Sequence, residues 1–338
     1  MRFIRICRLV VFGFLFFLTG LFAEESFQSP TIFQSDHATL EVSRFPLSPG
    51  SVDVFLKVFS IEKASKEHFS DVWKARRLAE SHFSKKGYSN RLCYSKIASD
   101  LPLKWQIVPY SFLPWYFDNF LFRKIYSVFK QAQILYQTTF SPKSLSDGSI
   151  SSQMPFWNDL DFSLEEEVKK TGTGILTEKR TIQKQLVYPP VFEENKEQIF
   201  LLYNYAPLNT GGEQMHFLIV PSPENPARNF LELDKNQYVA TLSIAKKVIM
   251  WAQEKFNGKA RIYFFDKTGK IAGQTQELYH AHLLIVSDKK EEFLGKTSMF
   301  LRMLYPPHPL SAKELLIRVS RYKKSFNLFL HKLDNEKL

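Results

Sequence analysis

Two histidines, His280 and His282, lie two residues apart in an apolar run from Leu278 to Val286. Because alternate residues of a β-strand face the same side, the two imidazoles would project from one face. Such a pair can supply a nucleophile and the group that orients it, two ligands of a metal ion, or part of an anion-binding pocket. His216 lies in another strand-like run and could reach the same face. The alternative without chemistry is that all three are ordinary core or surface histidines.

The apolar pattern around these residues predicts the elements that hold them. Strand-like runs lie at Ile199 to Tyr203 and at His216 to Val220. A long stretch from Asn236 to Phe256 follows, with apolar residues at helical spacing, and the run that contains His280 and His282 comes last. This order predicts an antiparallel sheet with one long helix packed across it.

The same residues resemble the signature of the histidine triad superfamily, His-φ-His-φ-His-φ-φ, in which φ is an apolar residue. Gly273-Gln274-Thr275 lies upstream, two residues further from the histidines than in the usual register, and Gln276 takes the register of the family glutamine if no gap is allowed. Met215 to Pro221 resembles an upstream strand of the family, and Ile199 to Asn209 resembles its first strand and turn. The resemblance spans roughly residues 197–288.

The resemblance implies a mechanism. In the family the middle histidine attacks the α-phosphorus and carries the nucleotidyl group as a covalent intermediate. That role falls on His282, with His280 as the residue that orients it. His216, Gln274 and Gln276 would contact the phosphate or the nucleotide. No metal or cofactor is needed for the covalent step.

Leu284 takes the third signature position, where the family has His or, in its nucleotidyltransferase branch, Gln. Losing one donor aimed at the phosphate commonly lowers a rate by a factor of about 10²–10³. The resemblance therefore implies a weak nucleotide hydrolase or nucleotidyltransferase acting on a phosphoramidate or dinucleoside phosphate. The alternatives are an inactive protein that binds a nucleotide, a phosphorylated ligand or a protein partner, and a zinc site formed by His216, His280 and His282.

The first half of the sequence repeats the pattern of the second. Its predicted elements are strands at Ala38 to Val42, Val54 to Phe59 and Leu101 to Pro109 and a helix at Lys66 to Lys85. Pro102, Lys104 and Gln106 then take the signature positions, so this half has no imidazole there. The arrangement resembles the duplicated galactose-1-phosphate uridylyltransferase and diadenosine-tetraphosphate phosphorylase branch. We therefore expect an α+β fold of two domains similar to the histidine triad fold, the first degenerate.

The N-terminus is typical of an export signal. Arg2, Arg5 and Arg8 precede an apolar run from Leu9 to Phe22, which is short for a transmembrane helix, and Ala23 precedes two glutamates. We expect a periplasmic or secreted protein, with an uncleaved membrane anchor as the alternative. The expected organisation is a signal peptide at 1–23, a degenerate domain with an aromatic helix at 24–140, a linker at 141–155, the second domain at 156–300 and a C-terminal helix at 301–338.

Composition sets further bounds. The hydrophobic content of 44% in 338 residues supports a packed core rather than disorder. A net charge of +11 favours an anionic partner, such as a phosphorylated small molecule or an anionic surface, and no motif indicates specific nucleic-acid binding. Cys93 is the one cysteine after the expected signal, which excludes an internal disulfide in the processed chain.

Overall fold

The computed structural model describes three stretches of the chain. These are residues 31–109, 176–287 and 309–336, apart from gaps at 45, 47–49, 100, 177–178, 191–198, 209, 211–212, 223–225, 270–271, 273 and 275. The predicted signal peptide, aromatic helix and linker lie outside the described residues. Thr31–Leu338 form one compact unit.

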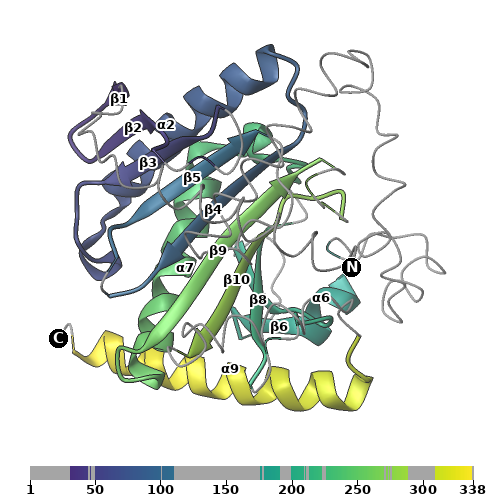
Figure 1. Ribbon diagram of the computed structural model, residues 1–338. Coiled ribbons are helices and arrows are strands. Elements are labelled where there is room, and N and C mark those ends of the chain that lie inside the picture. The colour runs from purple at the N-terminus through teal and green to yellow at the C-terminus, as the bar shows by residue number, and fades with distance from the viewer. Residues whose placement is uncertain are drawn as a thin grey trace, which may run out of the picture. The chain divides into compact units, whose positions relative to one another are not determined.

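One continuous sheet holds ten described strands, in the order β1-β2-β3-β5-β4-β9-β10-β8-β7-β6, and all neighbouring pairs are antiparallel (Figure 1). The first five strands are β1 (Thr31–Gln34), β2 (Ala38–Val42), β3 (Val52–Leu56), β4 (Arg91–Ile97) and β5 (Lys104–Pro109). The other five are β6 (Leu186–Tyr188), β7 (Ile199–Tyr203), β8 (Met215–Pro221), β9 (Ala260–Thr268) and β10 (Ala281–Ser287).

The two halves of the sheet have the same strand order. Outward from the central β4–β9 pair, one half runs β4, β5, β3, β2, β1 and the other β9, β10, β8, β7, β6. In each half a short 3-10 turn leads into a long helix at the same spacing. The turn η1 (Ile61–Lys63) precedes α2 (Lys66–Lys85), and η4 (Phe230–Glu232) precedes α7 (Lys235–Lys255).

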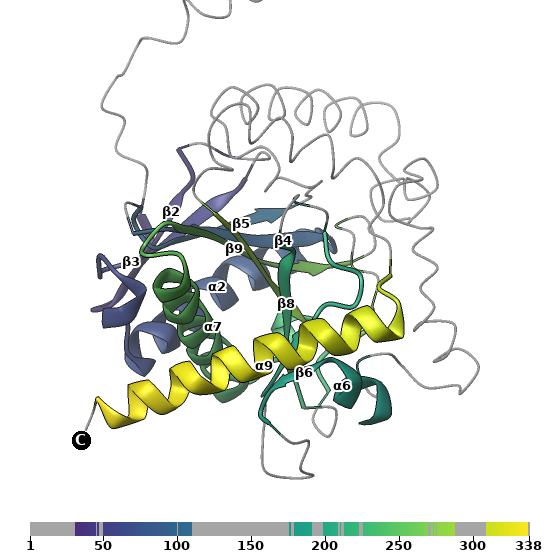
Figure 2. The ribbon, with the colours of Figure 1, turned by 90° about the horizontal axis from the view of Figure 1, so that it is seen from below.

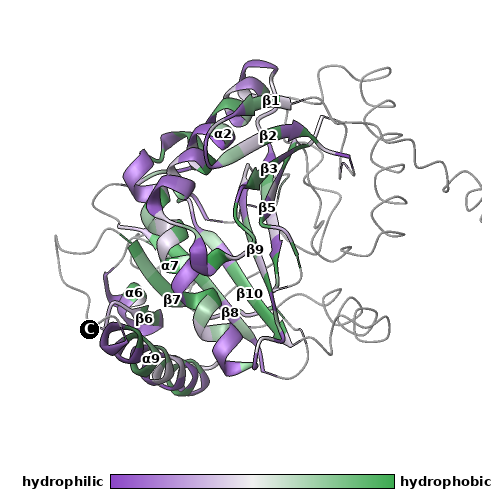
Figure 3. Ribbon diagram, turned by 90° about the vertical axis from the view of Figure 1, so that its left-hand side faces the viewer, coloured by the Kyte–Doolittle hydropathy of each residue, from purple (hydrophilic) through white to green (hydrophobic). Residues whose placement is uncertain are grey.

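Both long helices lie on the same face of the sheet (Figure 3). Helix α2 packs on β2, β3 and β5, whereas α7 packs on β7, β8, β9 and β10, and the two helices also contact each other. The start of α7 is fixed by a capping box. Asp234 accepts from the backbone N–H of Gln237, and the Gln237 side chain accepts from the backbone N–H of Asp234. The opposite face of the sheet is the one on which the histidines lie.

The C-terminal helix α9 (Ala312–Asn335) packs against β6, α7 and the short helix α6 (Lys179–Gln185) (Figure 2). Its buried stripe has helical spacing and consists of Leu315, Val319, Tyr322, Phe326 and Phe329. Among the helices of the described stretches, none combines the length and apolar character that a membrane crossing requires.

Several sequence-based expectations are confirmed. The fold is α+β with a large antiparallel sheet, β2, β7 and α2 have the predicted bounds, and α7 begins within one residue of prediction. Three strand positions are wrong. β3 lies earlier than predicted, at Val52–Leu56, β5 begins at Lys104, and β10 begins at Ala281, so that His280 precedes the strand instead of lying within it.

Candidate functional site

The three histidines lie together on one face of the sheet. In the pairing of β8 with β10, His282 lies opposite Leu218 and Leu284 opposite His216, so His216 and His282 are diagonal neighbours. The ring centroids of His216 and His282 are 5.2 Å apart, and those of His280 and His282 are 4.8 Å apart. The expected proximity is confirmed, whereas the chemical role of each imidazole stays a prediction.

A chain of hydrogen bonds fixes the proton of His216. The backbone N–H of Leu208 donates to Nδ1 of His216 over 3.2 Å, and the side-chain nitrogen of Asn204 lies 3.3 Å from the same atom. The Asn204 oxygen accepts from the backbone N–H of Ala206, which orients the amide. Because a backbone N–H can only donate, Nδ1 of His216 has no proton, and its neutral ring carries the proton on Nε2. That Nε2 lies 3.0 Å from Nδ1 of His282.

Burial keeps all three imidazoles neutral. Desolvation lowers the pKa of His216 to about 3 and that of His280 to about 4, and it holds the pKa of His282 well below its ordinary value. The ammonium of Lys267 lowers all three pKa values further. The pKa of Lys267 is itself lowered to about 8 by burial. Among the side chains that the structure describes here, Lys267 is therefore a cation near neutral pH and the three imidazole rings are neutral.

The Phe265 side chain packs against the His282 ring. It lies directly opposite His282 on β9, and the two rings stack with centroids 4.5 Å apart and an angle of 8° between their planes. The Lys267 ammonium lies 5.6 Å from the centre of the Phe265 ring. This arrangement offers an anionic ligand a cation and imidazole N–H donors on an apolar base.

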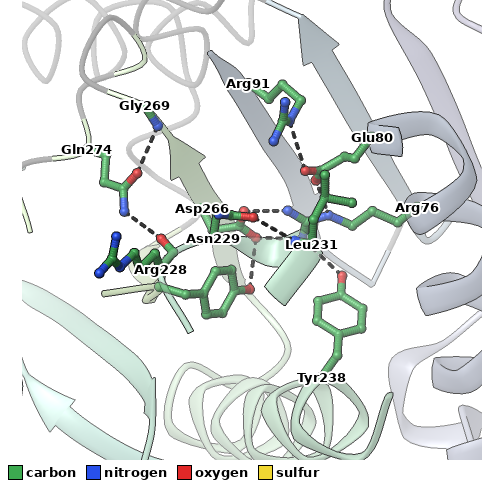
Figure 4. A network of polar contacts seen from close by, with 11 residues as sticks. Arg76, Glu80, Arg91, Arg228, Asn229, Leu231, Tyr238, Asp266, Gly269 and Gln274 are labelled. Atoms are coloured by element: carbon green, nitrogen blue, oxygen red, sulfur yellow. Dashed lines mark hydrogen bonds and ion pairs between the residues drawn. The ribbon is translucent and has the colours of Figure 1, made fainter. Parts of the chain in front are cut away.

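A buried ionic network centred on Asp266 of β9 is shown in Figure 4. Because side chains alternate along a strand, Asp266 lies on the face of β9 opposite Phe265 and Lys267. Arg76 of α2 makes two hydrogen bonds to Asp266, of 2.7 and 2.5 Å, and its Nε lies 2.6 Å from Glu80. The Tyr279 hydroxyl donates to Asp266 over 3.1 Å. Since Tyr279 immediately precedes His280, the network anchors the segment that carries this histidine. No sequence pattern joins Arg76 to a carboxylate that is 190 residues away.

The two predicted glutamines differ in what the structure shows of them. Gln274 has both polar ends of its side chain engaged with the backbone (Figure 4): its oxygen accepts from Gly269 N–H over 2.8 Å, and its nitrogen donates to the Arg228 carbonyl over 2.9 Å. It therefore closes the loop after β9. Gln276 is half-buried and precedes His280 by four residues in the sequence.

The zinc alternative has no support in the geometry. Within the described stretches, no group of three His, Cys, Asp or Glu side chains is placed to hold a metal ion. Nε2 of His216 and Nδ1 of His282 face each other in a hydrogen bond instead of turning toward a common point.

The first half has a different polar cluster on the corresponding strands. Gln106 lies opposite Asp53 in the β3–β5 pairing, as Leu284 lies opposite His216 in the β8–β10 pairing. The Lys104 ammonium lies 3.2 Å from Asp53, and the Gln106 amide donates to Asp53 over 3.0 Å and to Ser43 over 2.6 Å. The side chains described in this cluster include no imidazole, so it cannot form a phosphohistidine.

Comparison with known proteins adds structural neighbours only. No family model matches the sequence, and no curated protein matches it. Similar solved structures include a GalT-like protein from Arabidopsis thaliana, with 9% identity, a TM-score of 0.48 and coverage of 86% of this chain and 87% of that one. A uridylyltransferase has 11% identity, a TM-score of 0.48 and coverage of 89% and 88%. An ADP-glucose phosphorylase from Arabidopsis thaliana, solved with ADP-glucose, has 10% identity, a TM-score of 0.49 and coverage of 86% of each chain.

Proposed function

We propose that this chain binds a nucleotide or another phosphorylated small molecule at His216, His280 and His282 and transfers or hydrolyses its nucleotidyl group through a covalent nucleotidyl-histidine. The substrate class is a nucleotide phosphoramidate or a dinucleoside phosphate. If His280 takes the first signature position, Leu284 replaces one donor that the family signature provides, and transfer is then slow.

The observation that carries this proposal is the hydrogen bond of 3.0 Å between His216 and His282, with His280 against the same ring. A neutral imidazole with a lone pair is a nucleophile at neutral pH, and a neutral imidazole N–H is a hydrogen-bond donor. The cluster contains both, and Lys267 lowers the pKa of each ring, so the charge of the ammonium reaches the site. Ordinary core histidines do not require a cation beside them.

A binding protein without turnover is the second candidate. Leu284 is fully buried directly opposite His216, where it can give a phosphate oxygen neither a hydrogen bond nor a charge. A site with Lys267 and imidazole donors but too little stabilisation of the transition state would hold a phosphorylated ligand and leave it intact.

We also propose that the two halves arose as two copies of one unit, with boundaries at 24–140 and 156–300. The shared strand order, the matching turn and helix and the matching cross-strand positions of Asp53 and His216 support this. Residues 1–23 would direct export, which N-terminal sequencing of the protein recovered from the producing cells tests directly.

A trapping experiment tests the enzymatic proposal. The full chain is mixed with an adenosine phosphoramidate, quenched in alkali and examined for an adenylyl group by intact mass. We expect an adduct in the natural chain and in the control His82→Asn, which removes an exposed imidazole. We expect no adduct in the double variant His280→Gln/His282→Gln. No adduct, together with nucleotide binding in calorimetry, would leave the binding protein as the better account.

A further inference from the structure

His280 and His282 carry their single protons on opposite ring nitrogens. Nδ1 of His280 lies 2.8 Å from the carbonyl oxygen of Leu278. A carbonyl oxygen can only accept, so Nδ1 of His280 has the proton and donates it. Since a neutral imidazole has one N–H, Nε2 of His280 is left with a lone pair.

His282 is in the opposite state. His216 must carry its proton on Nε2, because Leu208 donates to its Nδ1. His216 therefore donates to Nδ1 of His282, which must be unprotonated to accept the bond. The proton of neutral His282 then lies on Nε2. In the resting site His280 offers a lone pair and His282 offers an N–H.

We infer that His280 is the imidazole that attacks phosphorus and that His282 is the donor to a phosphate oxygen, which reverses the roles implied by the sequence resemblance. The inference rests on the proposed function and names the nucleophile of that same site. If His280 carried its proton on Nε2, its Nδ1 lone pair would face the lone pairs of the Leu278 carbonyl oxygen. If His282 carried its proton on Nδ1, this N–H would face the Nε2–H of His216, or His216 would move its proton to Nδ1 and face the N–H of Leu208. Losing one such buried hydrogen bond costs about 1–3 kcal/mol, which makes the population of the reversed state roughly fivefold to 150-fold smaller.

The spacing of the sequence agrees with this assignment. Gly273-Gln274-Thr275 lies two residues too far from the histidines if His280 takes the first signature position. If His280 takes the middle position, Leu278 takes the first, His282 the third, and the offset disappears. The residue that replaces a signature histidine is then Leu278 rather than Leu284, and the nucleophile and the third polar group are both present.

The covalent step balances without a further reactant. The lone pair on Nε2 of His280 forms a bond to the α-phosphorus while the bond from phosphorus to the leaving group breaks, and the leaving group departs with the electron pair and takes a proton from solvent. The ring becomes cationic, and the Leu278 carbonyl stabilises the proton on Nδ1. Water then attacks phosphorus, the electron pair returns to Nε2, and the proton from water is released.

Two measurements on the natural chain test the assignment directly. In the first, the adduct formed with an adenosine phosphoramidate is digested under alkaline conditions and located by fragmentation that preserves the N–P bond. We expect it on His280. In the second, long-range proton–nitrogen correlation spectra of protein labelled with ¹⁵N-histidine report which nitrogen is protonated. We expect Nδ1–H for His280 and Nε2–H for His216 and His282.

Two substitutions of His282 separate the donor from the nucleophile. His282→Gln keeps an N–H donor and has no nucleophile, whereas His282→Leu has neither. We expect His282→Gln to form the adduct within about tenfold of the natural rate and His282→Leu to form it about 10²–10³-fold more slowly, which is the usual effect of one lost donor. His280→Gln should form none.

An adduct on His282, or its loss in His282→Gln while His280→Gln retains it, overturns the inference. Absence of any adduct in the natural chain overturns the proposed enzymatic function instead. The tautomer spectra then decide the proton assignment separately, and Nε2–H on His280 or Nδ1–H on His282 would contradict it.

Discussion

Nε2 of His216 lies 3.0 Å from Nδ1 of His282, and this hydrogen bond links the two strands that flank the candidate site. His216 is 2% exposed and accepts a hydrogen bond from Leu208 on its other nitrogen. The bond therefore transmits the orientation of the β7–β8 turn to His282 on β10. His216 acts as a positioning residue, because its effect on a ligand passes through His282.

Replacing His216 with methionine tests this link. Leu208 and Asn204 would lose their acceptor and His282 its donor, so we expect the free energy of unfolding to fall by about 1–3 kcal/mol. The His282 proton should then distribute over both ring nitrogens. Urea unfolding and ¹⁵N-histidine spectra measure the two effects. The control His331→Met, at an exposed position of α9, should change stability by less than about 0.5 kcal/mol. Unchanged His282 nitrogen shifts in His216→Met would contradict the link.

Burial of the imidazoles predicts loss of stability in mild acid. The pKa values of His216 and His280 are about 3 and about 4 in the folded chain, below their ordinary value of 6.5. Below about pH 6.5 the unfolded chain therefore binds protons that the folded chain does not, and the free energy of unfolding falls. Each histidine contributes a slope of up to about 1.4 kcal/mol per pH unit.

Urea unfolding between pH 6.5 and 5 measures this slope before most carboxylates titrate. His280→Gln should reduce the slope of the unfolding free energy by up to about 1.4 kcal/mol per pH unit, which corresponds to one proton. His82→Asn, at an exposed position, should leave the slope unchanged. Equal slopes in the natural chain and in His280→Gln would show that His280 is not buried in the neutral form.

The Arg76–Asp266 pair predicts a large effect on stability far from the histidines. Arg76→Met leaves the carboxylates of Asp266 and Glu80, each 1% exposed, without the guanidinium that bonds both. Removing one partner of a buried ion pair commonly costs about 3–5 kcal/mol. The matched control is Arg77→Met on the same helix, where a partly buried arginine donates to a backbone carbonyl and the expected loss is about 1 kcal/mol. Similar midpoints in thermal unfolding of the two variants would contradict the prediction.

Lys267 predicts a pH limit for binding anions. Its pKa of about 8 means that the ammonium loses its proton as the pH rises through about 8. The phosphate of AMP has a second pKa of about 6 and can only gain negative charge between pH 7 and pH 9, so any loss of affinity reflects the protein. We expect calorimetry with AMP to show weaker binding at pH 9 than at pH 7 in the natural chain. Lys267→Arg should bind equally at both values, because arginine stays protonated, and Lys267→Met should bind weakly at both. An equal pH dependence in Lys267→Arg would exclude Lys267 as its source.

Local patterns predicted the elements and tertiary pairing decided how they connect. The helices α2, α7 and α9 follow from apolar residues at helical spacing, and β2 and β7 follow from short apolar runs between turns. The sequence pattern did not single out β4 and β9, which form the central pair of the sheet. Each of these strands is buried on both faces, so it lacks the alternation that marks a half-exposed strand.

The sequence by itself determined which residues could do chemistry: His280 and His282 at a spacing of two, and His216 in a strand that a family resemblance places nearby. The tertiary structure alone decided where their protons lie. The proton of His280 depends on the Leu278 carbonyl, and that of His282 depends on Leu208 acting through His216. These partners are backbone groups whose directions are set by strand register and turn geometry. A residue type shows that an imidazole has one proton to place, whereas only the surrounding donors and acceptors determine which nitrogen receives it.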